Sequence, residues 1–272
     1  MQIPQKLLAR LKALDIDESI YDRRTRKCIL SKDEMNEKVP WHENAYYIGD
    51  NLEKKDRFVF DPVSLVPCLA LKPGKDDRIL DMCAAPGTKT FILCFLTGNA
   101  ARITANDIDR TRIRRLASNV NKFGLNCEIK NVSGRKIEGS FNKILLDAPC
   151  SGEGMVNKKE KLFRHWSEKR VKAFSSKQKK LIKHAFEMLE EGGVLVYSTC
   201  TFEPEENECV IDFLLHKNKN AELEEIKLNI RHVHGLAEWD NKVFCENMKK
   251  CMRIYPNHND TSGFFVAKIR KT

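Results

Sequence analysis

The sequence RILDMCAAPGTKT, residues 78–90, joins a short apolar run to a turn of small residues and then to a segment of helix length. Small residues and Gly87 let the backbone of such a turn approach a ligand closely, and the start of a helix offers free amide groups. The turn lacks the G-x-G-x-x-G pattern of dinucleotide-binding proteins and the G-K-[ST] ending of a P-loop. It therefore predicts a strand, a ligand-binding loop and a helix, and leaves the ligand open.

The alternation of strand and helix continues along the chain after this stretch. Three more apolar runs of strand length are RITAND (102–107), KILLDA (143–148) and GVLVYST (193–199). Helices are expected over 88–96, 110–123 and 177–189, the last of them ending at Gly192-Gly193 as a C-cap. Strands that alternate with helices predict an α/β fold with a parallel sheet, which binds its ligands beyond the carboxyl ends of its strands.

The first sixty residues differ from the rest in being polar and irregular in pattern. One segment there is amphipathic at helical spacing, through Ile3, Leu7, Leu8, Leu11 and Leu14. We therefore expect a short N-terminal appendage over 1–60, with room for a reduced RNA-binding element at most, and one main domain over 61–272.

The composition of the 272 residues, 42% hydrophobic and 32% charged, is that of a chain with one sizeable core. It contains no apolar run of membrane-spanning length, and its N-terminus lacks the pattern of a secretory signal, so we expect no membrane contact and a cytoplasmic location. In a eukaryotic source a nuclear or nucleolar location would also fit these features. The ten cysteines form no C-x-x-C pair, and a reducing compartment keeps thiols free, so we expect neither disulfides nor a metal site.

Positive charge is concentrated in one part of the chain. The net charge is +10, and residues 155–183 contain eleven Lys or Arg but only two Glu. Such a run is either a solvated helix face or a surface for nucleic acid. Phe163, His165 and Trp166 interrupt it, and they either belong to the core or stack on an unpaired base.

Reactive side chains follow the expected strands. Asp107 ends the second strand, where a carboxylate either caps the next helix or holds ribose hydroxyl groups. Cys150 and Cys200 follow the third and fourth runs. Each is either a packed apolar thiol or a nucleophile, and their location at neighbouring strand ends favours the second interpretation.

Three segments together identify a family: LDMCAAPGTKT (80–90), LLDAPCSGEGM (145–155) and YSTCTFEPEENECVI (197–211). They closely resemble the RsmB/Nop/Sun group of RNA cytosine-5 methyltransferases. The resemblance extends from about residue 61 to RIYPNHNDTSGFFVAKIRK (253–271). It implies a Rossmann-like class I methyltransferase fold, with a mostly parallel seven-stranded sheet and helices on both faces, and RNA as the substrate. The DTSGFFVAKI segment looks most like the tRNA-modifying branch, which favours tRNA over rRNA.

The resemblance also assigns catalytic roles. Carbon 5 of cytosine is too electron-poor to accept a methyl group until a thiolate has added to carbon 6. By analogy Cys200 makes that bond, Asp147 holds the base near ring nitrogen 3, and Cys150 assists release after methylation. Lys89 is expected beside a carboxylate or in the active site, the alternative being a lysine on the helix surface.

The cofactor implied by the resemblance is S-adenosyl-L-methionine. Its methionine part would lie against the first loop, Asp107 would hold the ribose, Arg112 would lie nearby, and Asp147 would line the same pocket. Ser133 stands in NVSGRKI (131–137), where the family is expected to have Asp, so the adenine contact is open. The loop residues are Cys83, Ala84, Ala85, Pro86, Gly87, Thr88 and Lys89, with Thr88 where the family often has a second glycine.

Two other functions remain open. DNA cytosine-5 methyltransferases use the cysteine of a Pro-Cys motif for attack, and would not need Cys200. A non-catalytic RNA-binding assembly factor would need neither thiol nor Asp147, so their presence argues against it. We expect a monomer whose RNA specificity comes either from its catalytic face or from a partner protein.

Overall fold

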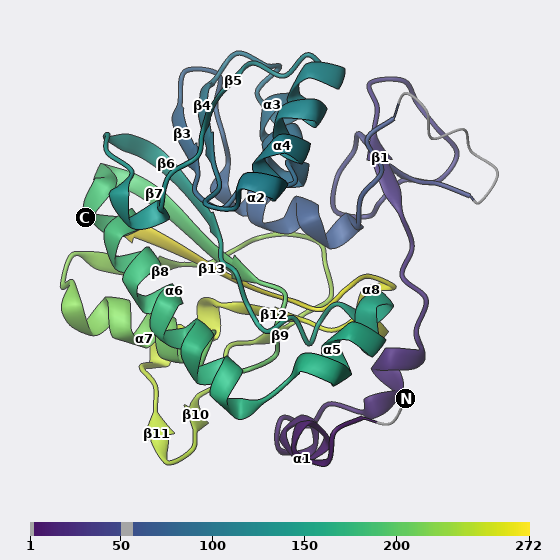
Figure 1. The fold of residues 1–272 in the computed structure, drawn as a ribbon, viewed down its shortest axis with the longest axis vertical. Coiled ribbons are helices and arrows are strands. Elements are labelled where there is room, and N and C mark those ends of the chain that lie inside the picture. Colours follow the sequence, from purple (N-terminus) through teal and green to yellow (C-terminus); the bar gives the residue numbers. More distant parts are fainter. Residues whose placement is uncertain (1–2, 50–56) are drawn as a thin grey trace.

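The computed structural model describes residues 3–49 and 57–272, and Figure 1 shows how their elements are arranged. Over these residues the main sheet has nine strands in the order β5-β4-β3-β6-β7-β13-β12-β9, and β8 pairs with β13 beside this path. Neighbouring strands from β5 to β7 are parallel, and the other pairs are antiparallel. The strands are β3 (Arg78–Asp81), β4 (Arg102–Asn106), β5 (Cys127–Lys130), β6 (Phe141–Asp147), β7 (Leu189–Thr199), β8 (Ala221–Glu224), β9 (Val233–His234), β12 (Met252–Ile254) and β13 (Phe264–Lys271).

The predicted α/β class, with a mostly parallel sheet and helices on both faces, is confirmed. In the described part of the chain the sheet has more strands than the seven expected. The difference arises at β13, which has eight residues. One side of β13 pairs with β7, and the other side is long enough to pair with two short strands. Its second half pairs with β8, its first half pairs with β12, and β12 pairs in turn with β9. Strands β12 and β9 therefore extend the sheet where β8 does not reach.

Helices cover both faces of this sheet (Figure 1). Side chains alternate between the two faces along a strand, so both faces must be apolar when both are covered. Ile79 and Val196 pack on one face with α2 (Leu65–Leu71) and α3 (Thr88–Leu96). Leu80 and Leu195 pack on the other with α6 (Glu168–Met188) and α7 (Glu208–Lys217). Helix α4 (Arg110–Lys122) packs through Leu116 on the alanines of the first loop and of β4.

Two predicted helices are confirmed almost to the residue, as α3 and α4, and the third is corrected. Helix α6 begins at Glu168, where Ser167 caps it by accepting a hydrogen bond from the Arg170 amide at 3.2 Å. It ends at Met188, and the glycine pair expected as its C-cap lies inside β7. The strand pairing shifts register just there, and Gly192 has a φ of +72°. The glycines therefore serve a bulge in the strand, where a left-handed residue is needed.

The N-terminal segment packs against the main domain. Helix α1 (Gln5–Ala13) forms at the predicted amphipathic stretch, and its buried face carries Leu7 and Leu11. These leucines share a cluster with Phe163 and Trp166. Strands β1 (Cys28–Leu30) and β2 (Ala45–Tyr47) form a separate hairpin-like pair that packs into the core beside α2. The segment therefore buries apolar surface of the following domain.

The remaining elements are short. Within residues 3–49 and 57–272, no helix combines the length and the apolar character needed to cross a membrane. The short elements are α5 (Lys159–His165), α8 (Pro256–Asn259), β10 (Glu238–Trp239), β11 (Lys242–Val243), and single turns of 3-10 helix at Glu18–Asp22, Pro62–Ser64, Gly134–Lys136, Val156–Lys158 and Glu246–Lys250.

Candidate active site

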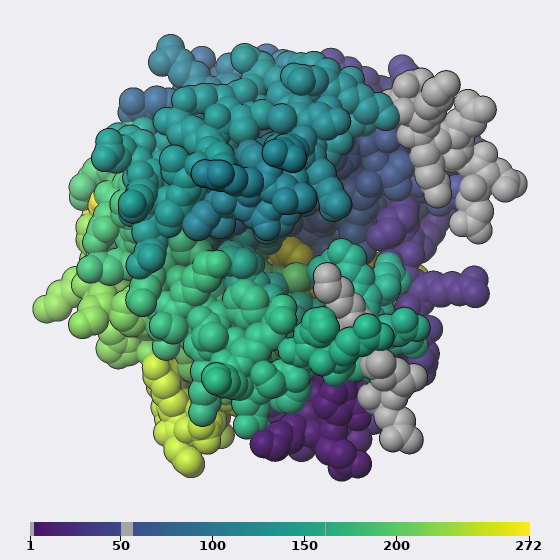
Figure 2. Space-filling model, viewed as in Figure 1, coloured from purple at the N-terminus to yellow at the C-terminus, as the bar shows by residue number. Residues whose placement is uncertain are grey.

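The polar residues expected at strand ends meet at one edge of the sheet. Asp147, at the end of β6, lies directly beside Ser198 of β7, and Asp81, at the end of β3, lies beside Leu145 of β6. Because the strands are parallel, the loops that follow them leave the sheet at the same edge. Figure 2 shows the surface hollowed between the blue-to-teal part of the chain that includes α3 and α4 and the green part that includes α5 and α6. Atoms from near the C-terminal end of the sequence form the bottom of this hollow.

Two cysteines from different loops face each other at this edge. Sγ of Cys150, in the loop after β6, lies 3.1 Å from Sγ of Cys200, which follows β7. Both are free thiols and both are partly buried. The hydrogen bond with Cys200 and burial raise the pKa of Cys150 well above its ordinary value. Cys150 therefore keeps its proton beside Cys200.

Lys89 and Asp147 form the charged part of the site. Nζ of Lys89 donates to Oδ2 of Asp147 at 2.7 Å, and Oγ of Ser198 donates to Oδ1 at 2.9 Å. The Lys89 side chain is 10% exposed, so the alternative of a helix-surface lysine is wrong. Nζ also lies 5.0 Å from the centre of the Phe264 ring. Burial by itself lowers the pKa of Lys89, but the attraction of Asp147 outweighs it and the pKa is raised.

The first loop is held in shape by hydrogen bonds from both sides. The Ala84 amide donates to the Asn106 carbonyl at 2.7 Å, and Asn119 of α4 donates to the Pro86 carbonyl at 2.8 Å. The peptide bond between Ala85 and Pro86 is cis. Gly87 has a φ of +107°, and a Cβ there would lie 2.8 Å from Leu116 of α4. The backbone conformation therefore favours glycine at this position, and a Cβ would also force the Leu116 side chain to move.

Thr88, the second departure from the family pattern, begins α3 with an N-cap at Gly87. Positive φ angles occur at Gly87 but not at Thr88. A side chain is therefore tolerated at position 88, as expected for a helical backbone.

Asp107 is almost completely buried beside this loop. Its Oδ2 accepts from the Ala85 amide at 3.2 Å and lies 3.4 Å from Nη2 of Arg112. The guanidinium of Arg112 also donates to the Ala85 carbonyl. The cap of α4 is Asp109, which accepts from the amides of Thr111 and Arg112. The alternative that Asp107 is an ordinary helix cap is therefore wrong.

Ser133 and Cys83 complete the predicted cofactor set. Ser133 precedes the turn Gly134–Lys136 and makes no capping hydrogen bond with its side chain. Cys83 is partly exposed in the first loop, and burial of its sulfur raises its pKa. Both side chains therefore remain candidates for the cofactor, although Ser133 lacks the charge of the acid expected in its place.

The site fits the cofactor that the resemblance implies. The first amides of α3 have no acceptor inside the helix, so they are available to a carboxylate. One oxygen of the buried Asp81 carboxyl, Oδ1, has no hydrogen-bond partner among the described residues, while Oδ2 accepts from Thr90 at 2.8 Å. Burial raises the pKa of Asp81 to about 7. The loop, Asp81 and Asp107 together offer groups for both the amino-acid part and the ribose of S-adenosylmethionine.

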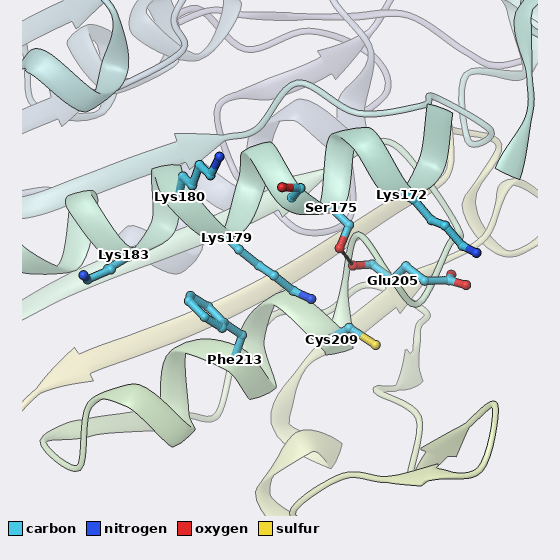
Figure 3. A pocket seen from close by; sticks show the side chains of 9 residues that line it. Lys172, Ser175, Lys179, Lys180, Lys183, Glu205, Cys209 and Phe213 are labelled. Carbon is cyan, nitrogen blue, oxygen red and sulfur yellow. Dashed lines mark hydrogen bonds between the residues drawn. The ribbon is translucent and has the colours of Figure 1, made fainter. Parts of the chain in front are cut away.

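The basic segment lies mainly on α6. A groove of about 500 Å³ between α6 and α7 is lined by Lys172, Lys179, Lys180 and Lys183. Figure 3 shows Lys179 reaching between Phe213 and Cys209, while Lys180 points away from α7. Of the two aromatic interpretations, packing in the core is correct for Phe163 and Trp166, which are buried, whereas His165 is exposed.

Three buried acids near the thiols were missed by reasoning from the sequence. Glu153, Glu203 and Glu206 are at most 1% exposed. They lie in the loops that carry Cys150 and Cys200. The sequence feature that could have indicated them is the density of acids after Cys200 in a basic chain. Reasoning from the sequence missed them because such a run ordinarily indicates a solvated surface.

Comparison of the sequence with known proteins shows which family the chain resembles. The family model for the 16S rRNA methyltransferases RsmB/F matches residues 68–270. The tRNA (cytosine(49)-C(5))-methyltransferase of Pyrococcus abyssi is 38% identical over 259 residues, covering 90% of this chain and 83% of that protein. Ribosomal RNA small subunit methyltransferase F of Vibrio vulnificus is 35% identical over 251 residues. That match covers 86% of this chain but only 52% of the bacterial protein.

Two solved structures from Pyrococcus horikoshii are also similar. A methyltransferase homologue superimposes with a TM-score of 0.82 at 28% identity, covering 99% of this chain and all of its own. NSun6, determined with SFG, an analogue of S-adenosylmethionine, superimposes with a TM-score of 0.70 at 34% identity. It covers 82% of this chain, which in turn covers 56% of NSun6.

Proposed function

Because the chain belongs to the RsmB/F family of RNA cytosine-C5 methyltransferases, we propose that it transfers a methyl group from S-adenosylmethionine to carbon 5 of a cytosine in structured RNA. The family inferred from the three motifs is thereby confirmed. The observation that carries the proposal is the proximity of the Cys150 and Cys200 thiols, 3.1 Å apart, beside the Lys89–Asp147 ion pair. A nucleophile, a second thiol and a carboxylate for the base thus share one edge of the sheet.

In the first step the Cys200 thiol gives its proton to solvent and its sulfur adds to carbon 6 of cytosine, while ring nitrogen 3 takes up a proton from solvent. Asp147 accepts a hydrogen bond from this N–H, which stabilises the protonated ring. Lys89 and Ser198 each occupy one carboxylate oxygen, so the carboxylate is oriented before the base arrives. Because its side chain is 28% exposed, Asp147 can still reach a base.

When bound, S-adenosylmethionine would supply the methyl group for carbon 5, with S-adenosylhomocysteine as the leaving group. The residues that would hold it are Asp107 for the ribose and the first loop with the start of α3 for the amino-acid part. Arg112 supports both, since it contacts the loop at Ala85 and lies 3.4 Å from Asp107. Ser133 would lie near the adenine.

Release requires that carbon 5 lose its proton before the bond between Cys200 and carbon 6 breaks. In the free protein, the first cause that keeps Cys150 protonated is its hydrogen bond with Cys200. When Cys200 is bonded to the base, this hydrogen bond is lost and the pKa of Cys150 falls, although burial still raises it. Cys150 then gives its proton to solvent. Its thiolate then takes the proton from carbon 5, the electron pair of the broken C–H bond restores the double bond, and Cys200 leaves as thiolate. Ring nitrogen 3 returns its proton to solvent.

We propose tRNA as the preferred substrate. The relative named for tRNA is matched over most of its length, whereas about half of the bacterial relative named for ribosomal RNA is matched. The match to the tRNA enzyme thus covers most of both proteins. This supports the preference that the C-terminal segment had suggested, and transcripts of both RNA classes test it.

The groove between α6 and α7 is the surface we propose for the RNA backbone. In the part of the chain that the structure describes, no carboxylate pairs with Lys172, Lys179 or Lys180. Glu205, the acid that lines the groove, is already paired with Arg10 at 2.5 Å. The positive charges of the groove are therefore available for phosphates.

We propose that residues 61–272 form the catalytic domain and that residues 1–60 support it. Arg10 of α1 donates to Glu203 at 2.6 Å, within the loop that follows Cys200. Leu7 and Leu11 pack against Phe163. Because Phe163 and Trp166 are buried in this cluster, they are not available to stack on RNA. The surfaces left for RNA binding are the catalytic face and the lysine groove.

The proposed function is tested with purified protein, S-adenosylmethionine labelled on its methyl group, and transcripts of tRNA and of ribosomal RNA. We expect label in RNA at cytosine, with 5-methylcytosine in the digested product, and none with Cys200→Ala. Label in DNA and not in RNA would favour a DNA methyltransferase. Binding of RNA with no label in either polymer would favour an assembly factor.

A further inference from the structure

A buried polar cluster joins the two cysteine loops behind the thiols. Its members are Ser151, Glu153, Gln178, Thr201 and Glu206, each at most 8% exposed. Ser151 and Glu153 come from the Cys150 loop, Thr201 and Glu206 from the Cys200 loop, and Gln178 from α6. The loops run side by side, because Oγ of Ser151 lies 3.1 Å from Oγ1 of Thr201, and the Gly154 amide donates to the Cys200 carbonyl at 2.9 Å.

Glu206 and Gln178 attach the backbone on both sides of Cys150 to the rest of this cluster. The Ser151 amide donates to Oε2 of Glu206 at 3.1 Å, although 55 residues separate the two in sequence. Nε2 of Gln178 donates to the same Oε2 at 2.7 Å and to the Pro149 carbonyl at 2.9 Å. The backbone on both sides of Cys150 is therefore attached to Glu206, directly or through Gln178.

We propose that Glu206 and Gln178 are positioning residues that hold the Cys150 loop against the Cys200 loop, and so set the separation of the two thiols. This inference rests on the proposed function, because it assigns these residues a part in the same reaction. Neither residue touches the base in this scheme. They act through the backbone of Pro149 and Ser151, which flank Cys150.

The contacts themselves require at least one acid of the cluster to carry a proton. The Ser151 hydroxyl contacts oxygens of Glu153, Thr201 and Glu206, but a hydroxyl donates only one hydrogen. Thr201 also contacts Glu153, so the two hydroxyls lack enough protons for all these contacts. Four contacts share two hydroxyl hydrogens, and a protonated Glu206 supplies one more by donating to Oγ of Ser151.

The surroundings of Glu206 favour the protonated form as well. Burial, and then the nearby Glu153, raise the pKa of Glu206 to about 9, against the hydrogen bonds from Ser151 and Gln178. The other titratable groups that face it are Tyr197 of β7, whose hydroxyl donates to its carbonyl at 2.6 Å, and Cys150. Arg10 of α1, which could have neutralised an acid here, pairs with Glu203 and Glu205 instead.

The substitutions Glu206→Gln and Glu206→Ala separate a positioning role from a need for charge. A glutamine amide can donate to Ser151 where the protonated acid did and still accept at its oxygen, so Glu206→Gln should keep kcat within about threefold. Glu206→Ala removes every tether, and a displaced reacting group costs about 100-fold in rate. We expect kcat to fall by about that factor, with the KM for RNA unchanged. Glu222→Gln, an exposed site on β8, controls for the loss of an acid.

A second measurement follows the thiols without any methyl transfer. Dibromobimane bridges two neighbouring thiols, and mass spectrometry of the digested protein gives the yield of the Cys150–Cys200 crosslink. We expect an unchanged yield in Glu206→Gln and a severalfold lower yield in Glu206→Ala. Gln178→Met, which keeps the length of the side chain but cannot make either hydrogen bond, should lower the yield too. If Glu206→Ala does not fold, the crosslink yield of Gln178→Met tests the positioning role in its place.

The outcomes distinguish this inference from the proposed function. Absence of methylation by the unaltered protein on every RNA would refute the proposed function, and the crosslink would still report on the loops. Retention of both kcat and crosslink in folded Glu206→Ala or Gln178→Met would overturn the inference. So would an equal loss in Glu206→Gln and Glu206→Ala, since the charge would then be what matters.

Discussion

Nζ of Lys89, in the first turn of α3, lies 2.7 Å from Oδ2 of Asp147, at the end of β6. This ion pair joins the loop proposed for the cofactor to the carboxylate proposed for the base. Both side chains are shielded, Lys89 more than Asp147. A pair in this environment is strengthened by its low local dielectric, and it is also costly to break on one side only.

Replacement of Lys89 by Met should therefore act on the chemical step. We expect kcat to fall on the order of 100-fold, the usual effect of removing one electrostatic interaction from an active site, because Asp147 loses the donor that orients it. Single-turnover methylation, with the Kd for S-adenosylmethionine from calorimetry, measures the effect against Lys75→Met, an exposed control. A weakened Kd with an unchanged kcat would instead mean that Lys89 holds the cofactor carboxylate.

The two thiols should give opposite trapping behaviour. Cys200→Ala cannot bond to carbon 6, so neither turnover nor a covalent adduct is expected. Cys150→Ala should still attack and methylate the base but fail to release it, so a protein–RNA complex should accumulate with S-adenosylmethionine and survive denaturing electrophoresis. The double variant should trap nothing. An adduct in Cys200→Ala that is absent in Cys150→Ala would reverse the two roles.

Asp107→Ala should weaken the binding of S-adenosylmethionine by about 1–3 kcal/mol, the cost of leaving a buried partner unpaired. The substitution also removes the acceptor for the Ala85 amide, so the loop loses support as well. Asp109→Ala is the matched control, since Asp109 caps α4 and its removal should lower stability without changing affinity. Equal affinity of the Asp107 variant in calorimetry would remove this residue from the cofactor site.

The lysine groove should make RNA binding steeply dependent on salt. Replacing Lys172, Lys179 and Lys180 by Gln should reduce the slope of log K against log salt by about 0.7–0.9 for each phosphate that the variant no longer neutralises. Lys32, Lys75 and Lys219 lie outside the groove and are exposed. Their triple Gln variant carries the same change in charge and should keep the slope. If both triple variants change the slope alike, the groove is a solvated helix face.

Protonation of Glu206 should make stability fall as pH rises. Its pKa lies near 9 in the folded protein, above its ordinary value of 4.5, so the folded state binds an extra proton between these limits. Its contribution is full below about pH 4.5 and is lost as pH rises through about 9, at about 1.4 kcal/mol per pH unit for one proton at most. Glu206→Gln should flatten the dependence in denaturant titrations across this range. Part of the slope should remain, because burial raises the pKa of Glu203 to about 8 as well; an unchanged slope would mean that Glu206 is ionised.

Local patterns in the sequence were enough to predict the strand, loop and helix of residues 78–96, because each depends on residues close together in the chain. Gly87 has a local signature of this kind, and its positive φ follows from the turn it occupies. The α/β class followed from the same alternation, since parallel strands and crossover helices repeat one local unit. The family followed from three such segments in order.

Only the tertiary structure decided which side chains share the site. Cys150 and Cys200 are 50 residues apart in sequence, and their proximity depends on the register of β6 against β7, where Asp147 pairs with Ser198. The same pairing explains why Gly192 lies in a strand and not in a helix cap. Phe163 and Trp166 are in the core because α1 covers them, and the acids after Cys200 are buried because α6 and the Cys150 loop enclose them. Register and burial depend on contacts between distant segments, and periodicity along one segment carries no information about its neighbours in space.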